Sequence, residues 1–296
     1  MYRIITDGSC DMPKKLAEKR NITVVPFYVT KDEKTYLKEG VDITKTEFYQ
    51  WMVDNPAKYP RSSTPSAQDF LDAFTAACEA GEDVLCICIT KKFSSSFDVA
   101  TAAKLMITDT YPDRRIEIVN SGVNTVLQAL FTLEAANMRD KGFSLDECIA
   151  GLERIKPTGR IFFTVGSIGY LAHGGRIGKL IGLADSILKI RPIITLKEGE
   201  IFPSGISRAR NKSLEQVEKL IAKYVSENFK SADEYEIVVG YGHDLAEALE
   251  FRRAVEALLL KLGHEKRLEC FHIGAVICVH TGPYPLGVGI LRKAVC

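Results

Sequence analysis

The chain has 296 residues, of which 46% are hydrophobic and 26% charged, the composition of an ordinary globular protein of about two domains. Its 39 basic and 38 acidic side chains give a formal net charge of +1, which directs it neither to nucleic acid nor to an anionic membrane. No apolar run approaches the roughly 18 residues of a transmembrane helix, and the first residues lack the pattern of a signal peptide. We therefore expect a cytoplasmic protein that does not bind nucleic acid.

The eight cysteines are spread along the chain, and no two of them form a Cys-x-x-Cys pair. Cys86 and Cys88 lie two apart in an apolar run, where alternation places both on one face of a strand as small core residues. No His-Glu-x-x-His motif or other cluster of metal ligands occurs in the sequence. We expect free, mostly buried thiols and no metal.

Strand and helix patterns alternate through the first half of the chain. Nearly continuous apolar runs predict strands over residues 2–6, 22–29, 83–90 and 115–120. Helical periodicity predicts helices over 13–20, 45–55, 66–80, 95–109 and 123–140, with a loop over 55–66. Apolar strands that alternate with helices are typical of a mostly parallel sheet with helices on both faces. We therefore predict an N-terminal α/β domain.

The second half follows a different pattern. Strands are predicted over 160–166 and 234–242, as a hairpin over 191–208, and as two strands around a Gly/Pro loop over 271–293. Helices are predicted over 214–229 and 245–262, and a Gly-broken helical stretch over 170–190. This order is typical of an α+β domain with a mixed or antiparallel sheet. The change of pattern predicts two domains, over residues 1–157 and 158–296.

Polar side chains gather at the ends of the predicted strands in the first half. The segments are TDGSCD at 6–11, RSSTPS at 61–66, TKKFSSS at 90–96 and NSG at 120–122. In an open α/β sheet such ends meet at one edge, where helix N-termini favour anions. Helix capping alone explains each segment taken singly. Together they predict a hydroxyl-rich rim suited to a small anion.

The usual nucleotide and hydrolase motifs are absent: the sequence has no GxxxxGK[ST], no GxGxxG after a strand and no GxSxG. His280 differs from the other histidines because a Gly/Pro loop that can approach a ligand closely follows it. The segment HGGRIGK presents Arg176 either beside a helix C-cap or in a basic loop that meets an anion or partner. The same two interpretations apply to Arg208.

The ordered set of segments resembles the DegV family. The matching segments are TDGSCDMP, SSTPS, ITKKFSSSFDVA, NSG, YLAHGGRI, KIRPII and HTGPYPLG, which span roughly residues 3–290. Proteins of this family are two-domain α/β carriers that bind one long-chain fatty acid between the domains, and some are the binding subunit of a bacterial fatty-acid kinase. The resemblance implies a carrier without catalysis of its own and without a cofactor. It also implies a separate ATP-binding kinase that phosphorylates the carried acid, and it allows transient membrane contact.

The resemblance also assigns individual residues. It implies that Ser62, Ser94 and His280 bind the carboxylate, and that Arg176 and Arg208 contact an anion or the partner. The remaining members of the implied head-group rim are Ser63, Ser95, Ser96, Thr281 and Gly282. With Ser94 assigned to the carboxylate, Ser95 or Ser96 is left to cap the helix that follows.

The sequence departs from the family pattern at five positions, and two of them are Gly8, where the family usually has serine, and Asn120, which replaces a common aspartate. Ser95, Cys278 and Tyr284 stand where the family has glycine. Tyr284 adds bulk and a hydroxyl close to the expected head group, which predicts a change in head-group geometry or in partner docking. The chain length and unsaturation of the acid, the presence of a partner kinase and the oligomeric state are not encoded in any of these motifs.

Two other functions fit the same residues. One is an enzyme that acts on a small acyl or phosphoryl substrate, with Ser94 as nucleophile or His280 as general base, although no third orienting group is identifiable. The other is a regulatory subunit whose bound lipid reports the state of the membrane.

Overall fold

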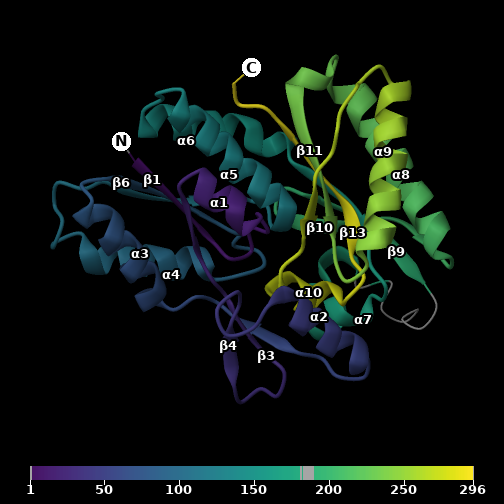
Figure 1. The fold of residues 1–296 in the computed structure, drawn as a ribbon, viewed down its shortest axis with the longest axis horizontal. Coiled ribbons are helices and arrows are strands. Elements are labelled where there is room, and N and C mark those ends of the chain that lie inside the picture. The colour runs from purple at the N-terminus through teal and green to yellow at the C-terminus, as the bar shows by residue number, and fades with distance from the viewer. Residues whose placement is uncertain (1, 181, 183–189, 296) are drawn as a thin grey trace.

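The computed structural model describes residues 2–180, 182 and 190–295, which form two large sheets flanked by helices and a small third sheet (Figure 1). The first sheet is parallel throughout. Its strands run in the order β2 (Ile22–Val25), β1 (Tyr2–Asp7), β6 (Asp83–Cys88) and β7 (Ile116–Asn120). The parallel sheet predicted for the first half is therefore confirmed.

Helices cover both faces of this sheet. The helices on one face are α3 (Ala67–Glu79) and α4 (Ser96–Ile107). Those on the other are α1 (Lys14–Lys19), α5 (Thr125–Asp140) and α6 (Leu145–Ile155). Ser66 and Ser144 begin α3 and α6 with complete capping boxes, which satisfy free N–H groups of the first turn. Because helices lie on both sides, the residues of β6 from Val84 to Cys88 are all buried.

The second sheet is mixed, as predicted for the C-terminal half. Its strands run in the order β10 (Glu200–Ser207), β9 (Arg191–Lys197), β8 (Arg160–Thr164), β13 (Leu286–Arg292), β11 (Tyr235–Tyr241) and β12 (Cys270–His272). Only the pair formed by β11 and β12 is parallel. The outer face is covered by α8 (Arg210–Asn228) and α9 (Leu245–Lys261), and the short η3 (Ala232–Glu234) precedes β11 along the chain.

A third, antiparallel sheet was not predicted. Its order is β4 (Tyr36–Lys38), β3 (Tyr28–Thr30) and β5 (Arg61–Ser63). The single strand predicted over 22–29 is wrong because β2 ends before Pro26 and β3 joins this other sheet. The loop predicted over 55–66 contains β5. Residues of β3 and of α2 (Lys45–Asp54) pack against α7 (Gly169–His173) and α10 (Ala275–Thr281).

The segment before Thr281 forms a helix, α10, where a strand was predicted. Its residues 275–279 are all apolar and all buried, so the sequence shows neither the 3.6-residue period of a helix nor the alternation of a strand. Two carboxylates distant in sequence accept hydrogen bonds from the N–H groups at its start. These tertiary contacts, which no local pattern reveals, favour the helix.

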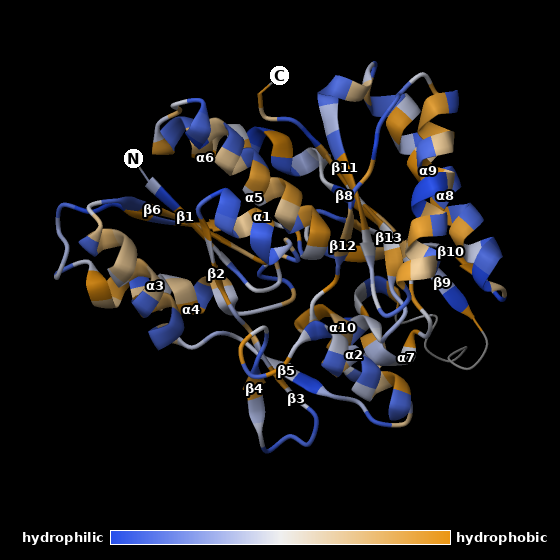
Figure 2. Cartoon of the chain, in the orientation of Figure 1, coloured by the Kyte–Doolittle hydropathy of each residue, from blue (hydrophilic) through white to orange (hydrophobic). Residues whose placement is uncertain are grey.

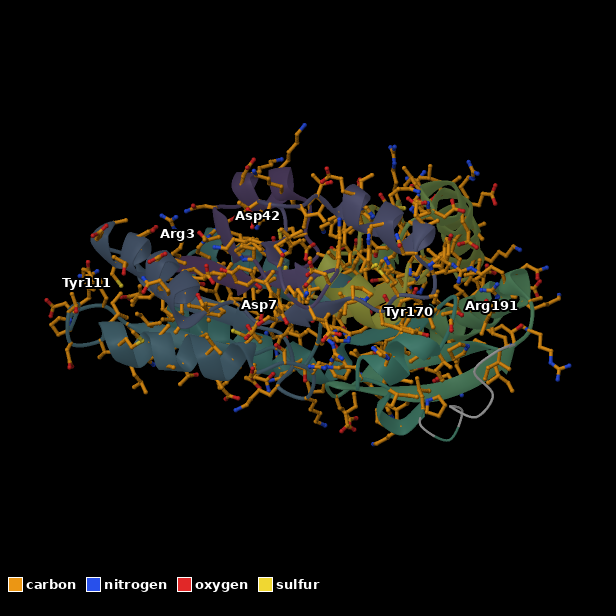
Figure 3. The ribbon with its side chains drawn as sticks, turned by 90° about the horizontal axis from the view of Figure 1, so that it is seen from below. Arg3, Asp7, Asp42, Tyr111, Tyr170 and Arg191 are labelled. Atoms are coloured by element: carbon orange, nitrogen blue, oxygen red, sulfur yellow. The ribbon has the colours of Figure 1, made fainter. Side chains whose placement is uncertain are left out.

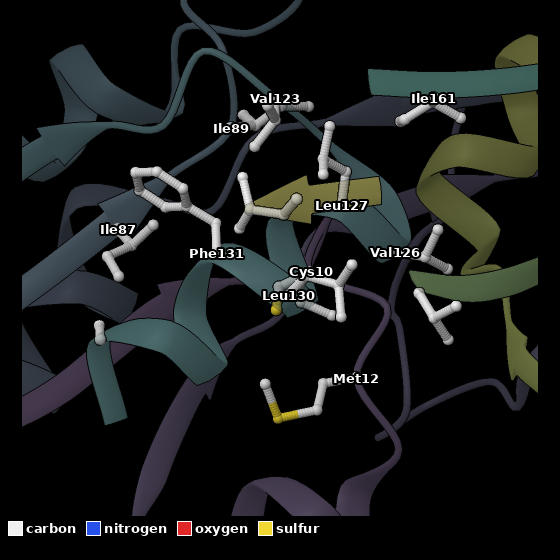
Figure 4. Close-up of a cluster of buried hydrophobic side chains, with 14 of the residues drawn as sticks. Cys10, Met12, Ile87, Ile89, Val123, Val126, Leu127, Leu130, Phe131 and Ile161 are labelled. Atoms are coloured by element: carbon white, nitrogen blue, oxygen red, sulfur yellow. The ribbon is translucent and has the colours of Figure 1, made fainter. Parts of the chain in front are cut away.

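The helix α5 joins the two halves of the core. It packs against β1 on one side and against β11 and β13 on the other. Figure 4 shows Phe131 on the side of α5 that faces Ile87, and Val126 on the opposite side. In Figure 2 the strands of both large sheets are mainly hydrophobic, and hydrophilic residues face outward on the helices. The short η1 (Lys156–Thr158) lies between the two sheets along the chain, and the predicted boundary at residue 157 stays a prediction.

Several smaller predictions are resolved by the same structure. The described cysteines are free thiols, and all but Cys270 are buried. Of the helical stretch predicted over 170–190, α7 is confirmed, whereas 181 and 183–189 lie outside the described residues. None of the helices in the described ranges combines the length and apolar composition needed to cross a bilayer.

Candidate functional site

A cavity is enclosed by the first turn of α5, the mixed sheet and α10. It contains about 1010 Å³ of space free of protein atoms, part of it open to solvent. Its apolar lining comes from both halves of the chain and comprises Phe27, Ile89, Phe93, Val126, Ile161, Phe163, Leu171, Leu196, Ile201, Ile273, Val276, Ile277 and Leu286. Its polar lining comprises Ser62, Thr64, Ser94, Ser95, Asn124, Thr125, Arg176, His280 and Thr281.

Ser62 and His280 meet in this cavity although they lie 218 positions apart in the sequence. The Ser62 Oγ atom on β5 lies 3.2 Å from Nε2 of His280 on α10. Neighbouring residues of a strand point to opposite sides, so Ser63 faces away and lines a separate groove beside α4. The structure therefore brings together two of the three predicted carboxylate-binding residues in direct contact.

The His280 ring lies in the cavity wall with most of its surface covered by protein. Burial, together with the nearby Arg176 guanidinium, lowers the pKa of His280 to about 4, so the ring is neutral near pH 7. Its Nδ1 atom is enclosed and has no hydrogen-bond partner among the described residues. A side chain at Gly174 would collide with this ring, so the glycine allows the end of α7 to approach it.

This depressed pKa predicts a pH dependence of stability. For the unliganded protein, we expect the free energy of unfolding to fall by about 2 kcal/mol more between pH 8 and pH 5 than for a His280→Gln variant. Below about pH 6.5 the imidazole of His280 binds a proton in the unfolded state but stays neutral in the folded state. The stabilisation of the folded state by the neutral ring is therefore complete above about pH 6.5 and is lost as the pH falls toward about 4. Urea unfolding of both proteins at pH 8 and pH 5 measures this difference in the free energy of unfolding. Equal decreases in the wild type and in His280→Gln would contradict the prediction.

The three consecutive serines after β6 have three different roles. Ser94 lines the cavity, and its Oγ accepts a hydrogen bond of 3.2 Å from the Ser96 N–H at the start of α4. Ser95 occupies the N-cap position of α4 without a side-chain capping bond, and it also lines the cavity. Ser96 points inward and donates to Asp7. Ser95 therefore stands at the predicted cap position, but the side-chain capping bond expected of Ser95 or Ser96 is wrong, because Ser94 accepts that bond.

Asp7, at the end of β1, holds this serine loop in place. Figure 3 shows it in the interior of the molecule, and it has no exposed surface. Its Oδ2 accepts from Ser96 Oγ at 2.7 Å and from the Ile89 N–H at 2.9 Å. Its Oδ1 accepts from Ser9 Oγ at 2.8 Å and from Gln128 Nε2 at 3.0 Å. Burial raises the pKa of Asp7, whereas these donors favour its ionised form.

A second pair of buried carboxylates fixes the start of α10. Asp11 Oδ1 accepts from the Gly274 N–H at 2.6 Å. The two carboxylate oxygens of Glu39 accept from the N–H groups of Ala275 and Val276, at 2.8 and 3.1 Å. Burial raises the pKa of both carboxyls, and the Lys45 ammonium opposes this shift. Residues of the first half thereby hold the helix whose other end presents His280 to the cavity.

The remaining predicted site residues are divided between the cavity and its surroundings. Arg176 and Thr281 line the cavity. The Arg176 guanidinium donates to the Phe93 and Gly174 carbonyls and, among the described residues, forms no ion pair with a carboxylate. Gly282 lies beside the Tyr170 ring instead of in the cavity wall. Arg208 is exposed after β10 and does not line the cavity.

Two of the departures from the family pattern also lie outside the cavity lining. Cys278 is fully buried and packs with Met52 and Tyr49 on the opposite side of α10. Tyr284 is 38% exposed and packs edge-on to His243. Its predicted bulk therefore does not enter the cavity. Among the three substituted glycine positions, only Ser95 lies in the cavity wall.

Asp7, Asp11 and Glu39 support the site but were not predicted. Asp7 and Asp11 stand in the segment TDGSCD, whose pattern predicts only helix capping or a place in the polar rim. Glu39 follows a short strand of the unpredicted sheet, so no local signal indicates its role. Within the described ranges, no cluster of three or more His, Cys, Asp or Glu side chains is placed to hold a metal ion.

Fold and site together define a class of α/β protein in which a mixed sheet, the helices α5 and α10, and loops that follow the strands of a parallel sheet line a largely apolar cavity with hydroxyl and imidazole groups in its wall. A family model described as "Uncharacterised protein, DegV family" matches residues 1–293. The chain belongs to the DegV family.

Solved structures of similar proteins support this assignment. The chain is 41% identical to a stearic acid-binding protein from Eubacterium ventriosum, with a TM-score of 0.94 and 99% of each chain covered. It is 27% identical to a fatty acid-binding DegV family protein from Thermus thermophilus, with a TM-score of 0.86 and coverage of 98% and 99%. The fatty acid kinase B3 protein of Streptococcus pneumoniae, loaded with linoleic acid, is 18% identical and shares the fold, with a TM-score of 0.81 and 99% coverage of each chain.

Proposed function

We propose that this protein binds one long-chain fatty acid in the cavity, with the carboxylate beside Ser62, Ser94 and His280 and the acyl chain among the apolar residues. The observation that supports this most strongly is a largely apolar cavity with a Ser62–His280 contact of 3.2 Å in its wall. Hydroxyl donors and a neutral imidazole are suited to a carboxylate, which would in turn raise the pKa of the ring.

Burial of the acyl chain supplies most of the binding free energy. Each buried methylene contributes about 0.8 kcal/mol, so a tail of roughly 15 methylenes contributes on the order of 12 kcal/mol before ordering costs. The polar groups then select an acid over other lipids, because a carboxylate left without donors in this cavity is strongly disfavoured. The expected ligand is therefore a free fatty acid.

The proposed role is that of a non-catalytic carrier in the cytoplasm, whose bound acid is the substrate of a separate ATP-dependent kinase that forms an acyl phosphate. The part of the wall with Ser95 and Arg176 supports this role, because both residues are exposed at the surface while lining the cavity. An arginine without a carboxylate partner in the described ranges suits the approach of a phosphoryl group. Arg208 is further proposed as a contact for the partner away from the cavity, and transient contact with a membrane would supply the acid.

An enzyme with a serine nucleophile has less support. Ser62 and His280 are within hydrogen-bonding distance, as in a nucleophile and base pair. However, His280 Nδ1 has no partner within the described ranges, so no carboxylate there orients the ring. Ser94, the nucleophile considered from the sequence, accepts a hydrogen bond from the backbone of α4.

The first test is direct identification of the ligand. We expect an organic extract of the purified, denatured protein to contain a long-chain fatty acid in about 1:1 ratio by mass spectrometry. Protein stripped of lipid should take up added oleate or palmitate to the same ratio. Absence of any fatty acid in the extract, together with no uptake of either acid, would refute the proposed function.

A second test separates the carrier from a lipid sensor. The loaded protein, mixed with ATP and a bacterial fatty-acid kinase subunit, should yield an acyl phosphate that is trapped by hydroxylamine as a hydroxamate. Neither protein alone should form it. Fatty-acid binding without any product in the mixture would support the sensor, and product from this chain alone would contradict a non-catalytic carrier.

A further inference from the structure

Asn124 lies in the cavity wall at the N-cap position of α5, yet its side chain does not cap the helix. Asparagine is among the preferred N-cap residues because its side-chain oxygen normally accepts a hydrogen bond from the first turn. Here the backbone of Asn124 is fully extended, with φ −152° and ψ 179°. The Oδ1 atom is enclosed and has no hydrogen-bond partner among the described residues. A polar group is thus left unsatisfied in a largely apolar cavity.

The backbone after Asn124 is strained in a way that keeps this arrangement. Thr125 has φ +47°, a left-handed conformation that is rare for a β-branched residue. Its Oγ1 donates to Asp11 Oδ2 at 2.6 Å, and Asp11 is fully buried. Strain of this kind persists only where the surroundings enforce it, and it concentrates at functional sites. The Thr125–Asp11 bond therefore holds the turn that directs Asn124 away from the helix.

Asn124 and the serine loop also lie at the same edge of the parallel sheet. The Thr90 N–H, just after β6, donates to the Val123 carbonyl at 2.9 Å, and the Ser94 N–H donates to the Thr90 carbonyl. These bonds tie the segment that contains Asn124 to the segment that contains Ser94. Both side chains line the cavity.

We propose that Asn124 is a further ligand-binding residue, which forms a hydrogen bond with the carboxyl group of the bound fatty acid, and that Thr125 and Asp11 position it. This inference rests on the proposed function and adds a contact to the same site. The side-chain amide can donate through Nδ2 to a carboxylate, whereas Oδ1 is enclosed by the protein and can accept from a protonated acid only if the amide group turns. Binding of the acid would then satisfy the polar group that the protein leaves unpaired.

The test compares two ligands that differ only at the head group. We expect Asn124→Ala to bind oleate at least about 10-fold more weakly than the wild type, as for the loss of a hydrogen bond to a charged group. Binding of oleyl alcohol should change less than about 3-fold. In Asn124→Asp, two carboxylates would face each other, so oleate binding at pH 8 should fall further while the alcohol is retained. Asn211→Ala, at an exposed position of α8, is the matched control.

Two variants test the positioning role of Thr125. Thr125→Val removes the hydroxyl that donates to Asp11 but keeps the shape, and it should weaken oleate binding as Asn124→Ala does. Thr125→Ser keeps the hydroxyl, so its affinity for oleate should stay within about 3-fold of that of the wild type. In the double variant Thr125→Val/Asn124→Ala, the loss should not exceed that of Asn124→Ala alone, because both changes remove the same contact.

The outcomes that overturn this inference are distinct from failure of the proposed function. Equal losses of oleate and oleyl alcohol in Asn124→Ala would show that Asn124 only shapes the cavity. Unchanged oleate binding in a folded Asn124→Ala protein would refute the contact outright. In both cases the wild type still binds oleate. A wild type that binds neither ligand refutes the proposed function and this inference with it.

Discussion

Replacing both Ser62 and Ser94 by alanine should weaken oleate binding by about 100-fold or more while the protein stays folded. The hydroxyls of these residues line the cavity, and a hydrogen bond to a charged group contributes about 1.5–3 kcal/mol. Loss of two such bonds leaves the carboxylate short of donors in a largely apolar cavity. Ser62→Ala also removes the contact with His280 Nε2, so the ring loses its one described partner.

The measurement is a titration of lipid-free protein with oleate and with oleyl alcohol. The alcohol lacks the charge and should bind the double variant nearly as well as the wild type, because the apolar lining is intact. Ser63→Ala is the matched control, because Ser63 adjoins Ser62 in β5 but lines the separate groove beside α4. Unchanged oleate retention in the double variant would refute the head-group assignment.

The parts of the fold that could be predicted are those with a strong local pattern. Asp83–Cys88 is an apolar run between a helix and a serine-rich turn, and such a run in an alternating chain forms a buried parallel strand. The hairpin of β9 and β10 was equally clear, because the turn at Glu198–Gly199, where both residues have positive φ, separates two apolar runs.

The parts that could not be predicted depend on contacts between distant segments. α10 is too short and too uniformly apolar to reveal its period, and its start is fixed by Asp11 and Glu39 from the first half. The strand predicted over 22–29 is divided between two sheets, which Pro26 alone does not specify. In both segments tertiary packing, and not local propensity, determines the secondary structure.

The candidate site shows the same division between local and distant information. The family resemblance assigned Ser62 and His280, and the structure places them in contact. The sequence alone predicts that Asn124 lies within a helix and that Asp7 lies within a capping segment. An asparagine that caps a helix and an asparagine at the same position whose side chain points away from the helix have the same sequence signature. Only the backbone geometry at Asn124 distinguishes the two.

The Asp7→Ala variant should lose about 3 kcal/mol or more of the free energy of unfolding, and it should also bind oleate more weakly. Removing a buried carboxylate leaves donors without an acceptor, among them the Ile89 N–H and the Ser96 hydroxyl. Asp7 also accepts the bond from Ser96 that fixes the loop containing Ser94. The single change therefore affects the core of the first half and the wall of the cavity together.

Chemical denaturation of lipid-free protein and oleate titration measure the two effects. The matched control is Asp98→Ala in α4, since Asp98 is exposed and pairs with Lys91 at 2.6 Å, an arrangement worth at most about 1 kcal/mol. A loss of stability in Asp7→Ala no larger than in Asp98→Ala would show that the desolvation of the ionised carboxyl cancels its hydrogen bonds. Full stability loss with unchanged oleate affinity would show that the serine loop keeps its position without the Ser96–Asp7 bond.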